Sequence, residues 1–327
     1  FADVVVLARE LNLGQVREIY DTISREDIKG PSGRPVRIEM FAHGALCMAI
    51  SGKCYLSLQT YGASANRGAC FQLCRRGYEV TDLETGTQLN IDNKYIMSPK
   101  DLCTIEFMDK IIDAGVKVFK IEGRARSAEY VKRCAQCYRK AADAVCEGTY
   151  TPELAASLKA ELSEVFNRGF WDGYYQGARL GEWSAVYGSQ ATRKKVYCGK
   201  VTNWFDRIGV AEIAVESSPL EVGAQCMAIG SKTGMIEFTV NDLRVDMKPA
   251  ERADKGVRCS VAIVPENRGP RDGDVELSAS SGCCADQAAA EASGGGNTTE
   301  DGQVTSGEKI PVRLRRGDKI YIWQKAN

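Results

Sequence analysis

Five cysteines gather in one irregular stretch of this 327-residue chain, between two segments that have strand character. Thiolates bind zinc and iron–sulfur clusters. Structural zinc sites usually use cysteine pairs about two to four residues apart, and only Cys70 and Cys74 form such a pair here. The wide spacing of the others favours a 4Fe–4S cluster, while buried packing cysteines are the alternative. The candidate ligands are Cys47, Cys54, Cys70, Cys74 and Cys103.

The one histidine of the chain, His43, lies four residues before Cys47. A neighbouring histidine and cysteine could act as base and nucleophile of a thiol protease. A single histidine excludes a metal site with two histidines and a serine triad built on another histidine. We expect His43 to line the active-site pocket, and a structural, hydrogen-bonded histidine is the alternative.

Charged side chains follow the expected strands at their carboxyl ends, where α/β-barrel enzymes place their chemistry. Guanidinium groups bind carboxylates and phosphates in a bidentate manner, so the arginines could hold an acidic substrate or an RNA phosphate. A solvated cluster of charges is the alternative, and Asp101 could simply favour a helix start. We expect catalytic roles for Lys100, Asp101 and Glu122 beside His43, and substrate binding by Arg9, Glu10, Lys120, Arg124 and Arg126.

Strand and helix patterns alternate over residues 1–190, which predicts parallel βαβ units. Only about three units are present, and a closed barrel needs about eight. We therefore expect an α/β fold: a TIM-like (β/α)-barrel whose N-terminal part is missing from this chain, because the sequence opens within a strand pattern and without Met. A homo- or hetero-oligomer could complete the barrel. The expected strands are 3–7, 34–44 and 116–123, and the expected helices are 13–23, 98–115 and 127–148.

Residues 191–327 have short strands between Gly and Asp turns, a pattern typical of a small antiparallel β-barrel. Within this domain, 277–308 has no aromatic residue and is expected to be a disordered insertion. Cations beside aromatic side chains are what single-stranded RNA binding requires, although Trp204 could instead pack between the domains. The expected RNA-binding residues are Arg193, Lys194, Lys195, Trp204 and Phe205.

The composition is that of a globular protein without a membrane span or a visible secretory leader. Lys and Arg total 43 and Asp and Glu total 43, so no global field attracts a polyanion. Thirteen cysteines, an odd number, argue against a disulfide framework and for a reducing compartment. We expect a cytoplasmic protein with no membrane partner.

The segment "EMFAHGALCMAISGKCYLS" (39–57) resembles the signature of the peptidase U32 family. The segments "NRGACFQLCRRGYEV", "SPKDLC", "KIEGRARSAEYV" and "NRGFWDGYY" follow in the order that this family shows. The resemblance covers about residues 3–180, and 195–264 with 310–325 resemble the family's C-terminal β-barrel.

This resemblance implies an enzyme. Members are often named collagenase-like peptidases, but the better-understood branches resemble oxygen-independent hydroxylation proteins acting on a tRNA wobble uridine, ribosomal RNA or a ubiquinone precursor. The architecture matches the tRNA branch, which uses prephenate as hydroxyl source, so we expect 5-hydroxyuridine formation on tRNA, with rRNA as the other RNA partner. The alternatives are a U32-type peptidase, whose catalytic set is incomplete here, and hydroxylation of rRNA or a quinone precursor. By similarity, the ligands of a 4Fe–4S cluster are Cys47, Cys54, Cys70 and Cys103, with Cys74 as the alternative ligand.

Overall fold

The computed structural model describes residues 2–64, 67–88, 97–124, 126–184, 188–264 and 313–326. The chain divides into two compact units, one of Phe1–Arg193 with Ala326–Asn327 and one of Lys194–Lys325. The insertion expected at 277–308 lies outside the described residues. Among the helices of these ranges, none combines the length and the apolar character that crossing a membrane requires.

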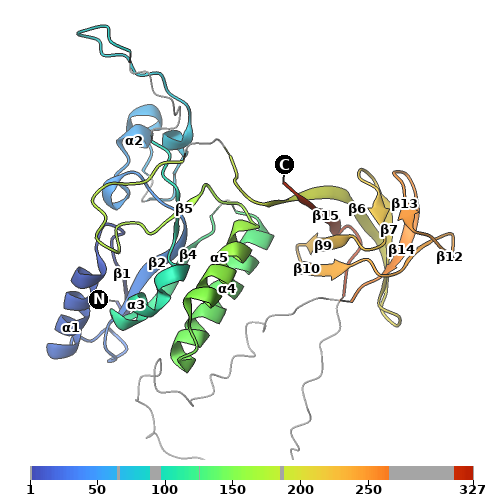
Figure 1. The fold of residues 1–327 in the computed structure, drawn as a ribbon, viewed down its shortest axis with the longest axis horizontal. Helices are drawn as coiled ribbons and strands as arrows, with labels where there is room; N and C mark the ends of the chain where they lie inside the picture. The colour runs from blue at the N-terminus through green and yellow to red at the C-terminus, as the bar shows by residue number, and fades with distance from the viewer. Residues whose placement is uncertain are drawn as a thin grey trace, which may run out of the picture. The chain divides into compact units, whose positions relative to one another are not determined.

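A five-stranded sheet forms the centre of the first unit (Figure 1). Its longest strand, β2, pairs in parallel with β1 and β4, as the βαβ pattern predicts. Through His43–Ala45 the same strand pairs antiparallel with β3, and β3 pairs in parallel with β5. The α/β class is confirmed, but the described residues form an open sheet and the TIM-like barrel is not confirmed. The strands are β1 (Val4–Val6), β2 (Arg37–Ala45), β3 (Asp101–Cys103), β4 (Val116–Glu122) and β5 (Phe170–Trp171).

Helices α1, α2 and α5 of this unit begin at a side-chain cap. Asn12 accepts a hydrogen bond from the Gln15 N–H in a capping box at the start of α1. Thr151 caps α5, whose first residue is proline, and α5 lies alongside α4 (Figure 1). The helices are α1 (Leu13–Arg25), α2 (Tyr55–Tyr61), α3 (Met108–Asp113), α4 (Ala128–Glu147) and α5 (Pro152–Ser163), with 3₁₀ turns at Ile50–Gly52, Leu73–Arg75 and Ile105–Phe107.

The prediction of a helix over 98–115 was wrong for the first half of this segment. Asp101–Cys103 form strand β3, a 3₁₀ turn follows, and only Met108–Asp113 are α-helical. All three residues of β3 are buried, because the strand lies between β2 and β5 and its Asp101 carboxylate contacts two arginines. Tertiary pairing therefore overrides the local helix signals.

Two apolar clusters pack against the sheet. One holds Cys134 and Cys137 of α4 with Leu158 and Leu162 of α5, which confirms that these two cysteines are core residues. The other joins α1 and α3 to β2, β3, β4 and β5. Each fully buried Leu or Phe side chain stabilises the fold by about 1.5–3 kcal/mol, so these clusters fix the sheet that carries the candidate site.

The second unit is an antiparallel β structure, as predicted. Eight strands form one sheet in the order β10-β9-β15-β6-β7-β14-β11-β12, and β13 pairs with β8. One apolar cluster fills its interior. The strands are β6 (Arg193–Phe205), β7 (Val210–Val215), β8 (Leu220–Glu221), β9 (Gln225–Gly230), β10 (Gly234–Thr239), β11 (Leu243–Val245), β12 (Lys248–Pro249), β13 (Arg252–Ala253), β14 (Arg258–Ala262) and β15 (Lys319–Lys325).

Gly44 on β2 has a φ of +112°, and a Cβ there would lie 2.5 Å from the Glu122 carbonyl oxygen. We expect Gly44→Ala to lower the free energy of unfolding by about 2–5 kcal/mol, the sum of backbone strain and overpacking. The control is Gly33→Ala, because Gly33 also has a positive φ (+75°) but open space around it; it should lose only about 1–2 kcal/mol. Chemical denaturation measures both, and equal losses would contradict the steric argument.

Candidate functional site

Four of the candidate cysteines lie in one region beyond the end of β2, within electrostatic range of Cys74; we call Cys47, Cys54, Cys70 and Cys74 the cysteine group. Burial raises the pKa of the Cys47 thiol, which also lies within electrostatic range of Cys70 and Cys54. Burial likewise raises the pKa of Cys74, and the thiols of Cys47, Cys70 and Cys54 add to this effect. The four thiols therefore share one local environment.

Short local elements hold the cysteine group in place. Cys54 is the N-cap of α2, and its Sγ accepts a hydrogen bond from the Ser57 N–H at 3.4 Å. The Arg75 guanidinium donates to the carbonyls of Leu46 (3.0 Å) and Pro99 (2.9 Å), and also to Ser98 Oγ. Arg75 thus fixes the turn that carries Cys74 to the segment that carries Cys47.

The cysteine group offers sulfur donors only. Within the described ranges, no three His, Cys, Asp or Glu side chains surround a point where a single metal ion would be held. A cubane cluster is larger than one ion, so its thiolate ligands stand farther apart. Soft thiolate ligands without carboxylate or imidazole are the donor set of iron–sulfur clusters. The chemistry of the group therefore fits such a cluster.

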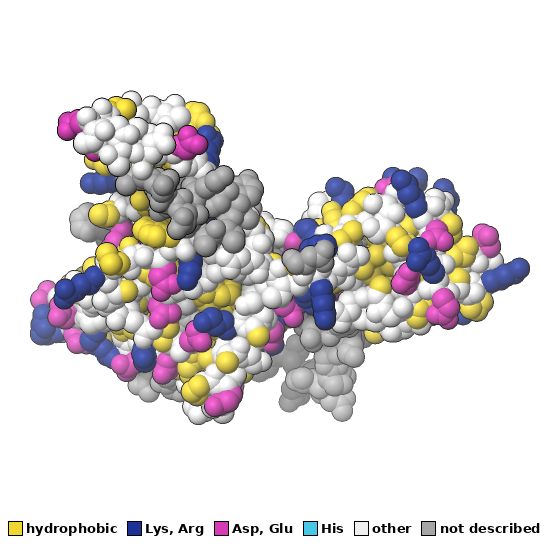
Figure 2. Space-filling view, turned by 45° about the horizontal axis from the view of Figure 1, so that its top comes forward, with side chains coloured by type: hydrophobic (Ala, Val, Ile, Leu, Met, Phe, Trp, Pro, Cys, Tyr) yellow, Lys and Arg dark blue, Asp and Glu magenta, His cyan; other side chains and the backbone are white. Residues whose placement is uncertain are grey.

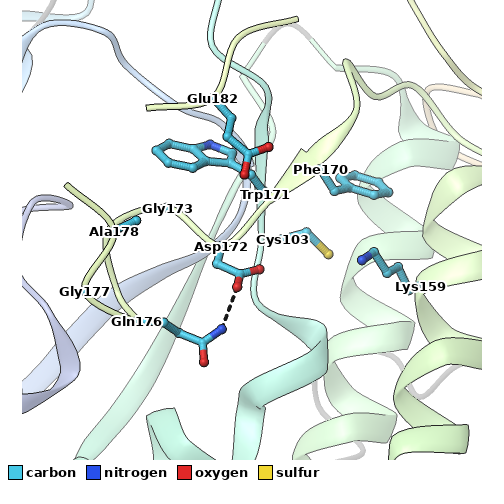
Figure 3. Close-up of a pocket in the computed structure, with 10 residues that line it drawn as sticks. All are labelled: Cys103, Lys159, Phe170, Trp171, Asp172, Gly173, Gln176, Gly177, Ala178 and Glu182. Atoms are coloured by element: carbon cyan, nitrogen blue, oxygen red, sulfur yellow. Dashed lines mark hydrogen bonds between the residues drawn. The ribbon is translucent and has the colours of Figure 1, made fainter. Parts of the chain in front are cut away.

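Cys103, the fourth ligand expected by similarity, lies in a different environment. It is buried in β3 within the core cluster, and Tyr138 Oη lies 3.8 Å from its Sγ. Burial raises the pKa of this thiol to about 11. Cys103 lines a cavity of about 440 Å³ together with Lys159 and Phe170 (Figure 3). The structure thus places Cys74, the alternative ligand, in the cysteine group and Cys103 outside it.

His43 is a buried core residue, with 1% of its surface exposed. Its Nδ1 lies 3.3 Å from Tyr138 Oη, and in the strand register it faces Cys103. Burial, with a smaller effect of Arg126, lowers the pKa of His43 to about 3. Both the imidazole and the Cys103 thiol are therefore neutral near pH 7, so they do not form the ion pair of a cysteine protease.

A buried charge cluster lies beside these residues. The Asp101 carboxylate is 1% exposed and contacts Arg126 and Arg168, each at 3.4 Å. The Arg126 guanidinium also lies 4.0 Å from the centre of the Phe166 ring. The structure thus joins a predicted catalytic residue, Asp101, to a predicted substrate-binding residue, Arg126, through an ion cluster. Asp101 starts β3 and does not start the helix that the sequence suggested.

Other predicted binding residues surround Phe41 on β2. Arg9 stacks on its ring at 3.7 Å and donates to the Ala45 carbonyl at 3.1 Å. Lys120 lies 5.4 Å from the same ring and forms an ion pair of 2.8 Å with Glu39. Half-buried Glu10 follows Arg9 in the same loop. The first strands of the unit therefore bring Arg9 and Lys120 to one aromatic ring.

The remaining predicted residues have local partners. Glu122 accepts a hydrogen bond from the Arg124 N–H at 2.9 Å, and the Arg124 guanidinium donates to the Gly68 carbonyl at 3.1 Å. Lys100 forms an ion pair of 2.7 Å with Glu182. Each of these charges has a structural partner, and Arg124 reaches the loop just before Cys70.

Sequence reasoning missed Arg75 and Arg168. Arg75 directly follows Cys74, and Arg168 lies in the Asn-Arg-Gly turn before β5. Both lie in segments of the family resemblance, but no charge pattern separates them from other arginines. The signal available for Arg75 was its position directly after Cys74, whereas Arg168 lies beside a strand that the sequence analysis did not predict.

The predicted RNA-binding residues differ in exposure. Trp204 packs against the core of the second unit and donates its indole N–H to Asp206 at 2.6 Å, so it is not a free stacking platform. Phe205 is 43% exposed. Lys194 is exposed, and Lys195 lies 5.2 Å from the centre of the Tyr321 ring. Arg193 belongs to the first unit, where it forms an ion pair with Glu164 at 3.2 Å. Basic and acidic side chains are interspersed on the face in Figure 2.

Comparisons with known proteins agree on one family. The model of peptidase family U32 matches residues 1–185. A collagenase of Porphyromonas gingivalis is 58% identical over 80% of this chain and 64% of its own length. A 23S rRNA 5-hydroxycytidine synthase of Escherichia coli is 39% identical over 54% of this chain and 26% of its own. The tRNA hydroxylation protein P1 of Bacillus subtilis is 32% identical over 62% of this chain and 46% of its own.

The chain covers less than two thirds of the length of two P. gingivalis collagenases that it matches, 64% of one and 65% of the other. A solved C-terminal domain of a Geobacillus thermoleovorans U32 peptidase covers 21% of this chain at 11% identity. Its TM-score of 0.20 carries no argument about the fold.

His43 permits a direct test of the buried site, because the chain has one histidine and therefore one imidazole signal. Its folded pKa of about 3 lies below the ordinary value of 6.5. Since the unfolded chain takes up the proton more readily, the stability from His43 is complete above pH 6.5 and falls as the pH drops towards 3. We expect the NMR shift of the ring to stay constant from pH 8 to 5. A midpoint near 6.5 would show an exposed histidine.

Proposed function

Because this chain belongs to peptidase family U32, we propose that it is the cysteine-bearing part of an RNA-hydroxylating iron–sulfur enzyme. The observation that carries the proposal is the cysteine group: four thiols from one region, of which Cys47 and Cys74 each lie within electrostatic range of Cys54 and Cys70. The ligands of the proposed iron–sulfur cluster are Cys47, Cys54, Cys70 and Cys74. The relatives named for rRNA and tRNA hydroxylation support an RNA substrate, and prephenate as hydroxyl source belongs to this proposal by family resemblance.

The residues around the cysteine group suit a thiolate-bound cofactor. When bound, an iron–sulfur cluster supplies one-electron chemistry. The Ser57 N–H donates to the Cys54 sulfur, and such bonds to ligand sulfurs stabilise the thiolate form. Arg9 acts on Cys47 and Arg75 on Cys74, and each guanidinium lowers the pKa of its neighbouring thiol against the effect of burial. These residues favour deprotonated ligands and hold them in place.

Anaerobic purification tests the cofactor. We expect iron, inorganic sulfide and broad visible absorbance in the native protein, and loss of most of the iron in Cys47→Ser, Cys70→Ser and Cys74→Ser. Cys103→Ala should keep its iron, because that thiol lies in the apolar core. The matched control is Cys146→Ser, a partly buried cysteine near the end of α4. Iron loss in Cys103→Ala with iron retained in Cys74→Ser would reverse the assignment of the fourth ligand.

RNA binding is tested in the second unit. We expect Lys194→Ala/Lys195→Ala to bind a tRNA transcript more weakly and with a salt dependence less steep by about 1.4, since each single-strand phosphate contact contributes about 0.7. The control, Lys248→Ala/Lys255→Ala, removes the same charge from exposed positions elsewhere in this unit. Filter binding over a salt series measures both variants. Equal affinity and slope in both would exclude Lys194 and Lys195 from the RNA surface.

A peptidase is the second candidate, because the 58% identical relative is named a collagenase. The geometry does not favour it, since His43 and Cys103 are 1% and 2% exposed. We expect the purified protein to leave fluorescent gelatin intact. Gelatin cleavage that persists through purification and disappears in Cys103→Ala, with the fold unchanged by circular dichroism, would establish the peptidase instead.

A further inference from the structure

A second cavity lies next to the cysteine group and is lined by basic side chains. Its volume is about 330 Å³. Arg75 and Arg76 directly follow Cys74 in the chain, and Arg168 reaches the cavity from the turn before β5. Of the described residues that line it, none is acidic. The lining consists of Gln72, Arg75, Arg76, Ser98, Phe166, Arg168 and Gly188.

The positive charge around this cavity exceeds the negative charge that contacts it. Asp101 is shared between Arg126 and Arg168. The contacts shown for Arg75 are neutral acceptors: two carbonyls and the Ser98 hydroxyl. Burial, and then repulsion from Arg75, lowers the pKa of Arg168 to about 10. Of the three guanidinium groups that line the cavity, the Asp101 carboxylate contacts that of Arg168 and is shared with Arg126 outside it, which leaves an electrostatic demand for an anion.

Two of these guanidinium groups are already fixed in position. Arg75 is held by its three hydrogen bonds. Arg168 is held between the Asp101 carboxylate at 3.4 Å, the Gln72 Oε1 at 3.4 Å and the Phe166 ring at 4.9 Å. An arriving anion would not have to order these side chains, and this preorganisation favours binding.

We propose that this cavity binds the carboxylate or phosphate group of a small molecule. Its volume lies within the range of about 300–1,000 Å³ that is usual for small-molecule sites, and guanidinium forks match the geometry of both oxyanions. Arg75 and Arg168 line it half-buried, while exposed Arg76 stands at its rim. The inference rests on the proposed function in one respect: an anion bound here would be the co-substrate of chemistry at the cysteine group.

The test is calorimetric titration with two probes, inorganic phosphate and malonate, at low ionic strength. Arg76→Gln removes an exposed cation whose one shown contact is the Tyr61 hydroxyl at 3.4 Å, so the fold should survive. We expect saturable binding to the unmodified protein and about tenfold weaker binding to Arg76→Gln, the loss typical of one charge-assisted contact. The control is Arg17→Gln, which removes a guanidinium paired with Asp113 outside the cavity, and its affinity should be unchanged.

Tighter binding of malonate would identify a carboxylate ligand, and tighter binding of phosphate would identify a small phosphate ester; both support the site. Absence of saturable binding by either anion, or equal affinities of Arg76→Gln and Arg17→Gln, would overturn the inference. So would weakened tRNA binding in Arg76→Gln without any binding of the two small anions, because the cavity would then contact the RNA backbone.

The same titration on air-exposed protein without iron separates this inference from the proposed function. The arginines are held by protein groups alone, so the anion should bind with or without a cluster. Anion binding by a protein that never acquires iron anaerobically would refute the cluster and keep the anion site. Iron binding without anion binding would refute the anion site and keep the cluster.

Discussion

The buried carboxylate of Asp101 is the constraint around which the first unit is organised. It lies on β3, and its two partners come from the segments before α4 and before β5, so one anion ties three parts of the chain together. Two charges taken out of water gain little net stability, and contacts of 3.4 Å are loose. Removing the carboxylate would nevertheless leave two buried cations unpaired, at a cost of about 3–5 kcal/mol. The cluster therefore specifies the arrangement of the strands more than it stabilises the fold.

Tyr138 shapes the neighbouring part of the sheet by hydrogen bonding. Its hydroxyl donates to the Ala42 carbonyl at 2.8 Å and accepts from the Thr104 N–H at 3.0 Å. These bonds connect α4 to both sides of the β2–β3 junction and place the hydroxyl beside His43 and Cys103. The apolar surroundings keep both side chains neutral. The histidine that suggested nucleophilic chemistry in the sequence, His43, thus belongs with Cys103 to the interior that supports the site.

An element of this structure can be predicted from the sequence when the residues that determine its conformation lie within the element itself. Segments with strong periodicity, such as α1 with its capping box and α4 with Gly148 at its C-terminal end, follow from local sequence. The start of the 98–115 segment does not, because its conformation is set by partners at Arg126 and Arg168 that lie far away in the sequence. Strand–helix alternation was enough to predict the α/β class. It was not enough to predict a closed barrel, which needs about eight βα units where about three were counted.

The same reasoning applies to the candidate site. Spacing identified the cysteine-rich region, and similarity favoured Cys103 over Cys74 as a cluster ligand. In the structure Cys103 enters the core, whereas Arg75 fixes the turn that carries Cys74 to Leu46, in the segment that carries Cys47. The role of Arg168 could not be predicted either, because it depends on the contact of this turn residue with the buried Asp101 carboxylate.

Burial raises the pKa of the Cys47 and Cys74 thiols, and the nearby arginines lower it. This balance affects how readily a cofactor would bind. In the free protein, burial raises the pKa of Cys47 and Cys74 above the ordinary value, so both thiols hold their protons at neutral pH. Metal binding requires the thiolates and therefore releases those protons. Arg9 and Arg75 lower this cost and then remain beside a site whose ligands have become negative. In the proposed cluster-bound form these arginines would stabilise the charged ligands, while in the free protein Cys47 and Cys74 are partly buried and Cys70 is exposed.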